Sequence, residues 1–286
     1  MNEQLIKASL RANNLTIGFH WIYDRKYLKK LSENENLLGQ KPKMKHYAKA
    51  ELSYYAYNEN SKYTLIGEIL KWLFEAIREN RDFDESDYKK LLLEKFMPGG
   101  SYNGYVESYA NKLVFNELSK YYKITPLELD DDQMVGFLPY FVYKWLYSND
   151  NITNYMDRAL SLASVLSNNN DYKTYFEMFD YLIENTKYET FDSDLEKAIS
   201  YAPEKARNNL TKALTIKDED EFIENYSSTA CNIYDAVSLI YFILANAKTY
   251  EEQLKLNIRL GGASADRAIL LTYLDVFISI NNETEE

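Results

Sequence analysis

The sequence has little of several residue types, and each scarcity excludes a class of protein. A single cysteine, Cys231, among 286 residues excludes an internal disulfide and a metal site built from clustered cysteines. Nine glycines and five prolines are few for a turn-rich all-β protein. Lys and Arg number 33 against 44 Asp and Glu, so the net charge is −11. Because an acidic chain repels phosphate backbones, we expect no nucleic-acid partner.

Long apolar runs are also missing. Residues 1–7 lack the apolar segment of a signal peptide. The longest apolar stretches, residues 237–245 and 268–280, are too short to span a bilayer, and Asp275 interrupts the second. We therefore expect a soluble cytoplasmic protein that does not bind membranes.

Most of the chain repeats apolar residues at helical spacing. Leu65, Ile69, Leu73 and Ile77 form one such stripe. Similar patterns predict helices starting at 84–86 and covering 106–121, 156–166, 172–183, 221–226, 250–260 and 265–280. Residues 52–57 alternate like a strand but can equally form a loop, and residues 168–170 form a polar turn between helices. The pattern predicts one all-α domain, residues 1–280, with an acidic tail at 281–286.

The expected helix ends rest on short local signals. Residues 125–128, Thr-Pro-Leu-Glu, resemble a capping box with proline in the first turn, and Pro139 then kinks that helix or begins another. Gly261 and Gly262 end one helix, and Ser264 caps the last. Because the last helix is apolar on nearly all sides, we expect it at the centre of a bundle.

Few residues point to chemistry on their own. There are two histidines, and Cys231 precedes an apolar helix, which is typical of a buried, unreactive thiol. The chain has no P-loop and no dinucleotide fingerprint. Residues 97–105 form a Gly-rich turn that can approach a ligand, although a plain interhelical loop is the simpler interpretation. The acidic run 130–132 is typical of a solvated helix N-terminus.

Several segments taken together resemble one family. Residues 20–24, HWIYD, preceded by ANNL at 12–15, resemble the A-D-A-L-G-x-P-x-H-W-x-Y-D opening of ADP-ribosylglycohydrolase-like proteins. The likeness is strongest to the branch that contains the J-type crystallins. Further segments similar to that branch are 83–88 with 96–105 (G-F-D-x-E-D-Y…F-x-G-P-G-S-Y-x-G-Y), 130–133 with 138–139 (A-D-D-N-Q…P-x-L), 168–170, 231 with the helix after it, and 256–268 (N-x-x-x-G-G-D-x-A-A-R-x).

The resemblance runs in order from about residue 10 to about residue 275. It implies an orthogonal all-α bundle, in agreement with the periodicity. In active members of the wider family, an early T-D-D-T segment and a late G-G-D-T-D-T segment hold two Mg²⁺ ions. The ions bind ADP-ribose and place the water that cleaves its glycosidic bond, which requires a dense set of carboxylates.

This chain departs from the family at those two segments. The early one falls on residues 64–67, where Leu65 and Ile66 replace both aspartates, and the late one on 261–266, where Ala263 and Ala265 do the same. Asp266 lies one position further on. We therefore expect no dinuclear magnesium site and no cofactor, while a single weakly bound cation near the acidic run stays open. Thr272, Tyr273 and Asp275 replace glycines of the family's last helix and should fill space between helices.

Three functions are compatible with these observations. In the first, the family's cleft survives as a non-catalytic site for an ADP-ribose-like nucleotide, lined by Tyr102, Asn103, Tyr105, Asp132, Gln133, Ser264 and Arg267, with tyrosines to stack the base and Arg267 to pair with phosphate. In the second, Asp132 and Asp266 form a metal-free acid–base pair of an active hydrolase. In the third, the chain is a crystallin-like structural protein or binds a protein partner. We expect His20 and Trp21 to support a loop.

Overall fold

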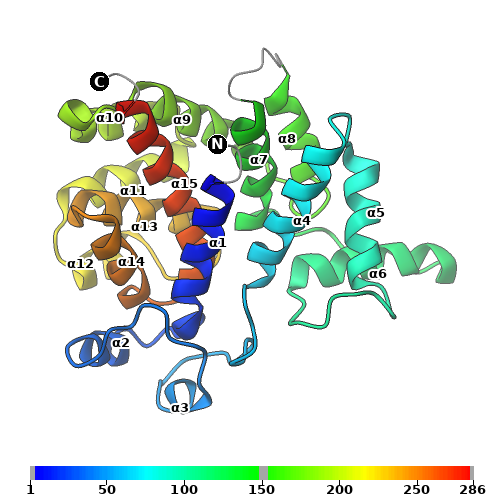
Figure 1. The fold of residues 1–286 in the computed structure, drawn as a ribbon, viewed down its shortest axis with the longest axis horizontal. Helices are drawn as coiled ribbons and strands as arrows, with labels where there is room; N and C mark the ends of the chain where they lie inside the picture. Colours follow the sequence, from blue (N-terminus) through cyan, green and yellow to red (C-terminus); the bar gives the residue numbers. More distant parts are fainter. Residues whose placement is uncertain (1–3, 148–153, 284–286) are drawn as a thin grey trace.

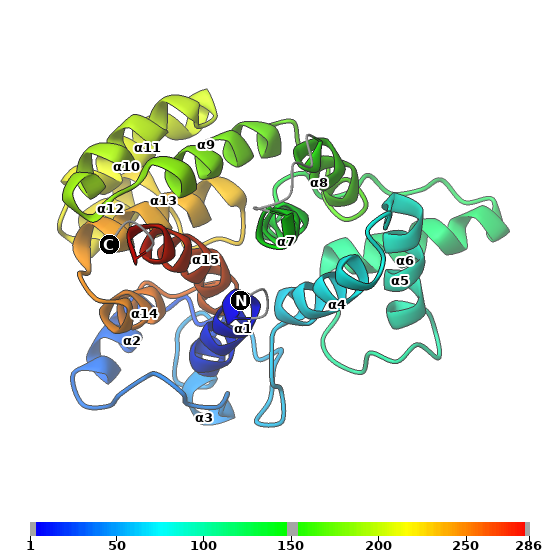
Figure 2. The same cartoon turned by 45° about the horizontal axis from the view of Figure 1, so that its top comes forward.

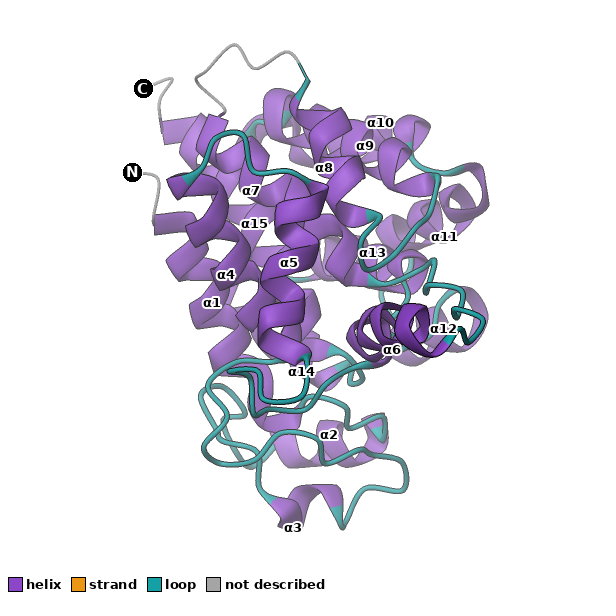
Figure 3. Ribbon diagram, turned by 90° about the vertical axis from the view of Figure 1, so that its right-hand side faces the viewer, coloured by secondary structure: helices purple, strands orange, loops and turns teal. Residues whose placement is uncertain are grey.

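The computed structural model describes residues 4–147 and 154–283, and within them the chain folds into helices joined by loops, with no strand longer than a single bridge (Figure 3). The α-helices are α1 (Gln4–Thr16), α2 (Arg25–Ser32), α3 (Met44–Tyr47), α4 (Leu65–Glu79), α5 (Glu85–Phe96), α6 (Ser108–Tyr122), α7 (Leu138–Tyr147), α8 (Tyr155–Ala163), α9 (Asp171–Asn185), α10 (Phe191–Ala198), α11 (Glu204–Thr215), α12 (Glu219–Tyr226), α13 (Ile233–Asn246), α14 (Tyr250–Arg259) and α15 (Ser264–Glu283). Four 3₁₀ turns accompany them: η1 (Ile17–Phe19), η2 (Met134–Phe137), η3 (Tyr188–Thr190) and η4 (Ile199–Tyr201). The all-α prediction is confirmed.

Helix α15 lies at the centre of the bundle, as its apolar composition predicts. It packs against α1, α9, α13 and α14. Helices α9 to α13 lie to one side of it, and α4, α5 and α6 lie to the other, beyond α1 and α7 (Figures 1 and 2). The apolar stripe of α4 is buried, with Leu65, Ile69 and Leu73 fully covered. Burial of such stripes is the main favourable contribution to the fold.

Tyr273 fills space inside this bundle, as predicted. Its ring lies 3.9 Å from the ring of Phe141, centroid to centroid, and its hydroxyl donates to the Phe141 carbonyl at 2.9 Å. Thr272 is also buried and shares a hydrogen bond with Tyr250 at 2.7 Å. These side chains tie α15 to α7 and α14.

Some predicted helix ends are confirmed. Asp84 caps α5 in a reciprocal capping box with Asp87. Pro139 is the second residue of α7, where its missing N–H is not needed, so it marks a second start. Gly261 and Gly262 follow α14 with φ of 78° and 66°, the left-handed region that glycine tolerates and that ends helices.

The capping box predicted at residues 125–128 is wrong, because no helix forms there. Lys123 ends α6 in the left-handed conformation, and residues 124–133 run as a loop. The amide of Asn116 holds the loop by binding the N–H and C=O of Leu127 at 2.7 and 2.9 Å. Residues 121–128 are all exposed, so a helix at 125–128 would have no apolar face to bury.

Two further expectations need correction at the last helix. Ser264 begins α15, but its hydroxyl is buried without a hydrogen-bond partner in the described chain, so it does not cap the helix. Helix α15 continues to Glu283, beyond the predicted boundary at residue 280, and residues 284–286 of the predicted tail lie outside the described residues.

Residues 52–57 form a loop, with a single bridge between Ser53 and Ile22. No helix among residues 4–147 and 154–283 is long and apolar enough to cross a membrane.

Candidate functional site

The N-termini of α4 and α15 converge on a buried polar cluster, and Asn13 of α1 holds them together. The Asn13 amide donates to the Thr64 hydroxyl at 2.8 Å and to the Ala265 carbonyl at 3.0 Å, and its oxygen accepts from the Thr64 N–H at 3.0 Å. Thr64 caps α4 and donates its hydroxyl proton to Asp266 at 2.6 Å. The segments at 64–67 and 261–266, which the sequence compares with metal-binding segments, therefore lie side by side.

The loop after α1 adds His20 and Trp21 to this cluster. The N–H of Trp21 donates to the Gly262 carbonyl, and the N–H of Gly262 donates to the Ile22 carbonyl, each at 2.8 Å. A Cβ atom on Gly262 would lie 2.0 Å from the carbonyl oxygen of Thr229, so glycine is required there. Trp21 itself has a φ of 64°, which is strained for a residue other than glycine. Paired backbones thus fix His20 against the first turn of α15.

His20 is a neutral, fully buried imidazole. Burial, together with the positive charge of Arg267, lowers its pKa to about 3. Its Nδ1 accepts a hydrogen bond from the N–H of Ala265 at 3.2 Å, so the ring proton is on Nε2. Nε2 lies 3.5 Å from the nearer carboxylate oxygen of Asp266. The expectation that His20 supports a loop agrees with this geometry, although the ring also faces an acidic side chain.

Asp266 and Glu107 form a pair of buried carboxyl groups. Burial raises the pKa of Asp266 to about 7, while the Thr64 hydrogen bond and Arg267 act in the opposite direction. Burial, and then the charge of Asp266, raises the pKa of Glu107 well above its ordinary value. The Tyr57 hydroxyl donates to Glu107 at 3.1 Å. Both carboxyl groups therefore keep their protons to a higher pH than they would in water, which is the property that a general acid working near neutral pH requires.

Arg267 supports the turn before α15. Its Nε donates to the Asn257 side chain at 3.0 Å, and its Nη2 donates to the carbonyls of Asn257 and Gly261 at 3.1 and 2.7 Å. Burial lowers its pKa to about 10, so it stays charged at neutral pH. The predicted phosphate-binding role would use the remaining nitrogen, Nη1, which has no hydrogen-bond partner within residues 4–147 and 154–283.

Tyr105 covers the cluster from outside. Its ring packs edge-on against Trp21 at 5.4 Å and Tyr57 at 6.2 Å, centroid to centroid, and is 47% exposed. Tyr102 donates to the Tyr105 carbonyl at 3.1 Å, but its ring lies in a separate aromatic group with Trp72 and Phe96. Asn103 is exposed on the same turn. Of these three predicted ligand residues, Tyr105 alone packs on the cluster's own aromatic rings.

Asp132 and Gln133 lie in a neighbouring loop. The Gln133 amide donates to the Asp132 carboxylate at 2.6 Å, and the Asp132 carbonyl accepts from Ile233 at the start of α13 at 2.8 Å. In the described chain no hydrogen bond or ion pair joins Asp132 to Asp266. In the acidic run, Asp130 is paired with Lys112 at 2.7 Å.

Cys231 lies beside the cluster, and its thiol is held in the protonated form. Burial, and then the charges of Glu107 and Asp266, raise its pKa to about 12. Its sulfur lies 3.7 Å from the Tyr23 hydroxyl. Cys231 is only partly buried, so the prediction of a fully buried residue is wrong, but its side chain packs against the core as an apolar residue does.

The residues at the convergence do not fit a pair of magnesium ions. Leu65, Ile66, Ala263 and Ala265 are buried apolar side chains, and Mg²⁺ requires oxygen ligands. Within residues 4–147 and 154–283, no group of three or more His, Cys, Asp or Glu side chains is placed to hold a metal.

No protein-family model and no curated protein matches this chain. The resemblance to ADP-ribosylglycohydrolase-like proteins therefore stays a prediction.

Sequence reasoning singled out Asp266, Ser264, Arg267 and Tyr105 but missed Glu107. A single glutamate just before a helix is usually exposed to solvent. Glu107 is instead buried and accepts a hydrogen bond from Tyr57, which only the structure shows. No sequence signal marks it.

Proposed function

We propose that this protein binds an ADP-ribose-like nucleotide without hydrolysing it, on an ADP-ribosylglycohydrolase-like scaffold. One observation carries the proposal. Two buried donor groups at the first turn of α15, Ser264 Oγ and Arg267 Nη1, have no hydrogen-bond partner among the described residues, and His20 Nε2 beside them has only the Asp266 carboxylate at 3.5 Å. Each buried, unpaired donor costs about 1–3 kcal/mol. A ligand rich in acceptor oxygens, such as a diphosphate or a ribose, would satisfy them.

An exposed aromatic ring that packs on Trp21 supports the same ligand. Tyr105 has an exposed face on which a purine can stack. Because Asp266 and Arg267 are only 1% and 0% exposed, the proposal requires that side chains covering the first turn of α15 move when a nucleotide binds.

Hydrolysis is less well supported, because the family's metal-ligand positions carry buried apolar side chains and His20 uses Nδ1 to bind the backbone. Two-metal catalysis has no ligands at this place. The metal-free alternative pairs Asp132, in the loop before η2, with Asp266, in the first turn of α15, and no hydrogen bond joins the two in the described chain. If Asp132→Asn or Asp266→Asn abolished release of ADP-ribose from a modified peptide while the protein stayed folded, the hydrolase alternative would replace our proposal.

The test combines calorimetry with paired serine variants. ADP-ribose should bind with or without Mg²⁺, and chromatography should detect no cleavage of an ADP-ribosylated peptide. Ser264→Ala removes an unpaired buried hydroxyl, so it should weaken ADP-ribose binding without lowering the melting temperature. Ser238→Ala in α13, which removes another buried and unpaired hydroxyl, is the matched control and should leave binding unchanged. No binding of ADP-ribose at millimolar concentration, or equal loss in both variants, would overturn the proposal.

A protein-binding or crystallin-like role is the second candidate, and a different surface favours it. Tyr121 and Tyr122 at the end of α6 are 75% and 73% exposed, and Ile124 and Leu127 follow them on the surface. Exposed apolar patches of this kind are often contact sites. A second copy of the chain is the simplest partner to test, by light scattering over a range of concentrations. Tyr122→Lys should abolish any self-association, whereas Tyr54→Lys, at another exposed tyrosine, should not.

A further inference from the structure

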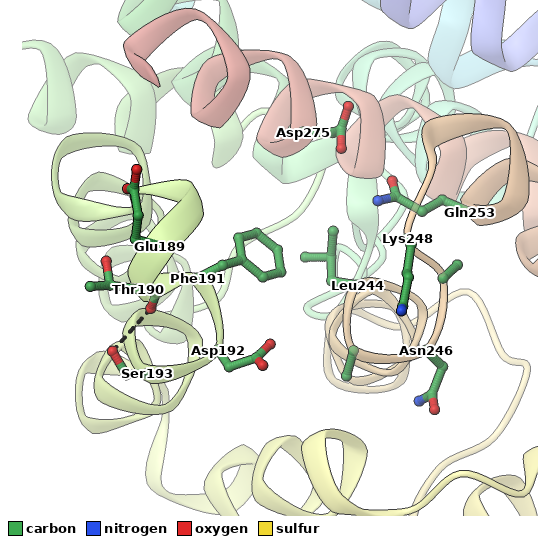
Figure 4. Close-up of a pocket in the computed structure, with 12 residues that line it drawn as sticks. Glu189, Thr190, Phe191, Asp192, Ser193, Leu244, Asn246, Lys248, Gln253 and Asp275 are labelled. Atoms are coloured by element: carbon green, nitrogen blue, oxygen red, sulfur yellow. Dashed lines mark hydrogen bonds between the residues drawn. The ribbon is translucent and has the colours of Figure 1, made fainter. Parts of the chain in front are cut away.

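A hollow of about 650 Å³ opens between the start of α10, the end of α13, α14 and α15 (Figure 4). Its volume lies within the range of sites for small molecules. It shares α14 and α15 with the polar cluster around Asp266, but none of the residues that line it belongs to that cluster. What it can bind is therefore a separate question from the proposed nucleotide site.

The walls of the hollow are negatively charged. Glu189, Asp192 and Asp275 line it, against the single cationic side chain of Lys248. The last turn of α13 also faces it, at Leu244 to Asn246, and the C-terminal end of a helix carries partial negative charge. Such walls attract a cation.

Gln253 adds an acceptor that lacks a donor. Its side chain is 5% exposed and hydrogen-bonds to Asp275. Its Oε1 is buried with no hydrogen-bond partner in the described part of the chain. Figure 4 shows the amide extending toward the interior of the hollow, beneath Asp275. The missing partner must be an N–H or O–H group, because the atom is an acceptor only.

The middle of the hollow is apolar. Figure 4 shows the Phe191 ring and the Leu244 side chain between Asp275 above and Asp192 below. An aromatic ring also attracts ammonium groups to its face. The lining thus runs from acidic to apolar to acidic, which matches a short hydrocarbon chain with a cation at each end.

We propose that this hollow binds a linear alkyl diammonium ion. One ammonium group donates to Gln253 Oε1 and pairs with Asp275, the methylene chain packs against Phe191 and Leu244, and the second ammonium group pairs with Asp192. Burial raises the pKa of Asp275, and the hydrogen bond from Gln253 opposes this rise. An adjacent ammonium ion would favour the ionised carboxylate further.

Calorimetry with simple amines tests the arrangement on the full-length protein. 1,4-Diaminobutane should bind, butylamine should bind about ten-fold more weakly because it lacks the second charge, and 1,4-butanediol should not bind. Equal affinity for butylamine and the diamine would refute the two-ended site. No binding of the diamine at about 10 mM, with no change in melting temperature, would refute the site altogether. Displacement of the diamine by an equal concentration of Mg²⁺ would point instead to a simple metal-cation site and would also overturn the proposal.

Variants locate the site. Asp192→Asn, at an exposed position, should weaken diamine binding about three-fold, and Gln253→Met, which keeps the shape, about ten-fold. Glu224→Gln removes an exposed carboxylate on α12 and is the control for general attraction to an acidic protein. If it weakens binding as much as Asp192→Asn does, the proposal is wrong. If Gln253→Met does not fold, the single variants Phe191→Leu and Asp192→Asn test the site in its place. Unchanged affinity for the diamine in both variants would refute the site.

Discussion

Replacing Asp266 with Asn should make the protein less sensitive to pH. In the folded protein the Asp266 carboxyl is buried and accepts a hydrogen bond from Thr64, and burial raises its pKa from 3.8 to about 7. In the unfolded chain the same group ionises in water. Between these two pKa values the folded state holds a proton that the unfolded state releases, so stability falls as pH rises.

The size of the effect follows from the two pKa values. The free energy of unfolding should fall with pH from about 4 until about 7 and then level off, because above pH 7 the group is ionised in both states. Each pKa unit corresponds to about 1.4 kcal/mol. Over the range from pH 5.5 to 7.5, Asp266 alone should therefore lower the stability by about 2 kcal/mol. Asp266→Asn keeps an oxygen to accept the Thr64 hydrogen bond but cannot ionise, so it should lack this loss.

Urea unfolding at several pH values between 5.5 and 8.5 measures the difference. This range stays above the sequence pI of about 4.9, near which an acidic protein precipitates. The stability of Asp266→Asn relative to the natural protein should increase by about 2 kcal/mol between pH 5.5 and 7.5. Asp82→Asn, at an exposed carboxylate, measures the effect of removing one surface charge. If the free energies of unfolding of Asp266→Asn and of the natural protein instead differ by the same amount at every pH, Asp266 does not titrate in this range. In that case our account of the cluster is wrong.

Three further outcomes are expected. Gly262→Ala should lower the free energy of unfolding in urea by about 3 kcal/mol or more, because the residue has a positive φ and a Cβ atom there would collide with a backbone carbonyl. A loss of stability below about 1 kcal/mol would contradict this. Cys231, whose pKa burial raises to about 12, should react with an alkylating reagent about 1,000-fold more slowly in the folded protein than in urea, and comparable rates would contradict its burial. Tyr273→Phe should lose about 1 kcal/mol with its hydrogen bond to a backbone carbonyl; Tyr241→Phe, which removes a buried hydroxyl without a partner, should lose nothing, and equal losses would refute the argument.

The helices could be predicted from the sequence where an apolar stripe and an end signal agree. Helix α4 shows both, since its stripe is buried and Thr64 caps it. The segment at 125–128 shows only the end signal, because nothing apolar follows on one face, and Asn116 occupies its backbone groups instead. Local capping motifs predict where a helix can begin, whereas burial decides whether one forms.

The site could be predicted only in part. Asp266 and Arg267 were singled out because residues 256–268 resemble a segment of the family, but their burial depends on how α1, α4 and α15 pack. The pairing of Asp132 with Asp266 rested on expected neighbouring segments, and the structure gives each carboxylate different partners. Glu107 illustrates the general difficulty, since a buried acid and a solvated one look alike in a sequence.

The buried carboxylate of Asp266 has a physical role even if the site is empty. The N-termini of two helices, α4 and α15, meet beside it, and each carries partial positive charge. Arg267 adds a full positive charge at the same place. A negative group is favoured there, yet complete burial opposes ionisation, and the pKa of about 7 reflects both effects.

A ligand phosphate bound beside Asp266 would raise the pKa of this carboxyl further, because two negative charges would then compete for the same positive groups. Nucleotide binding at this site should therefore be accompanied by proton uptake near neutral pH, and calorimetry in buffers of different ionisation enthalpy would detect it. Binding without proton uptake would place the phosphate away from Asp266.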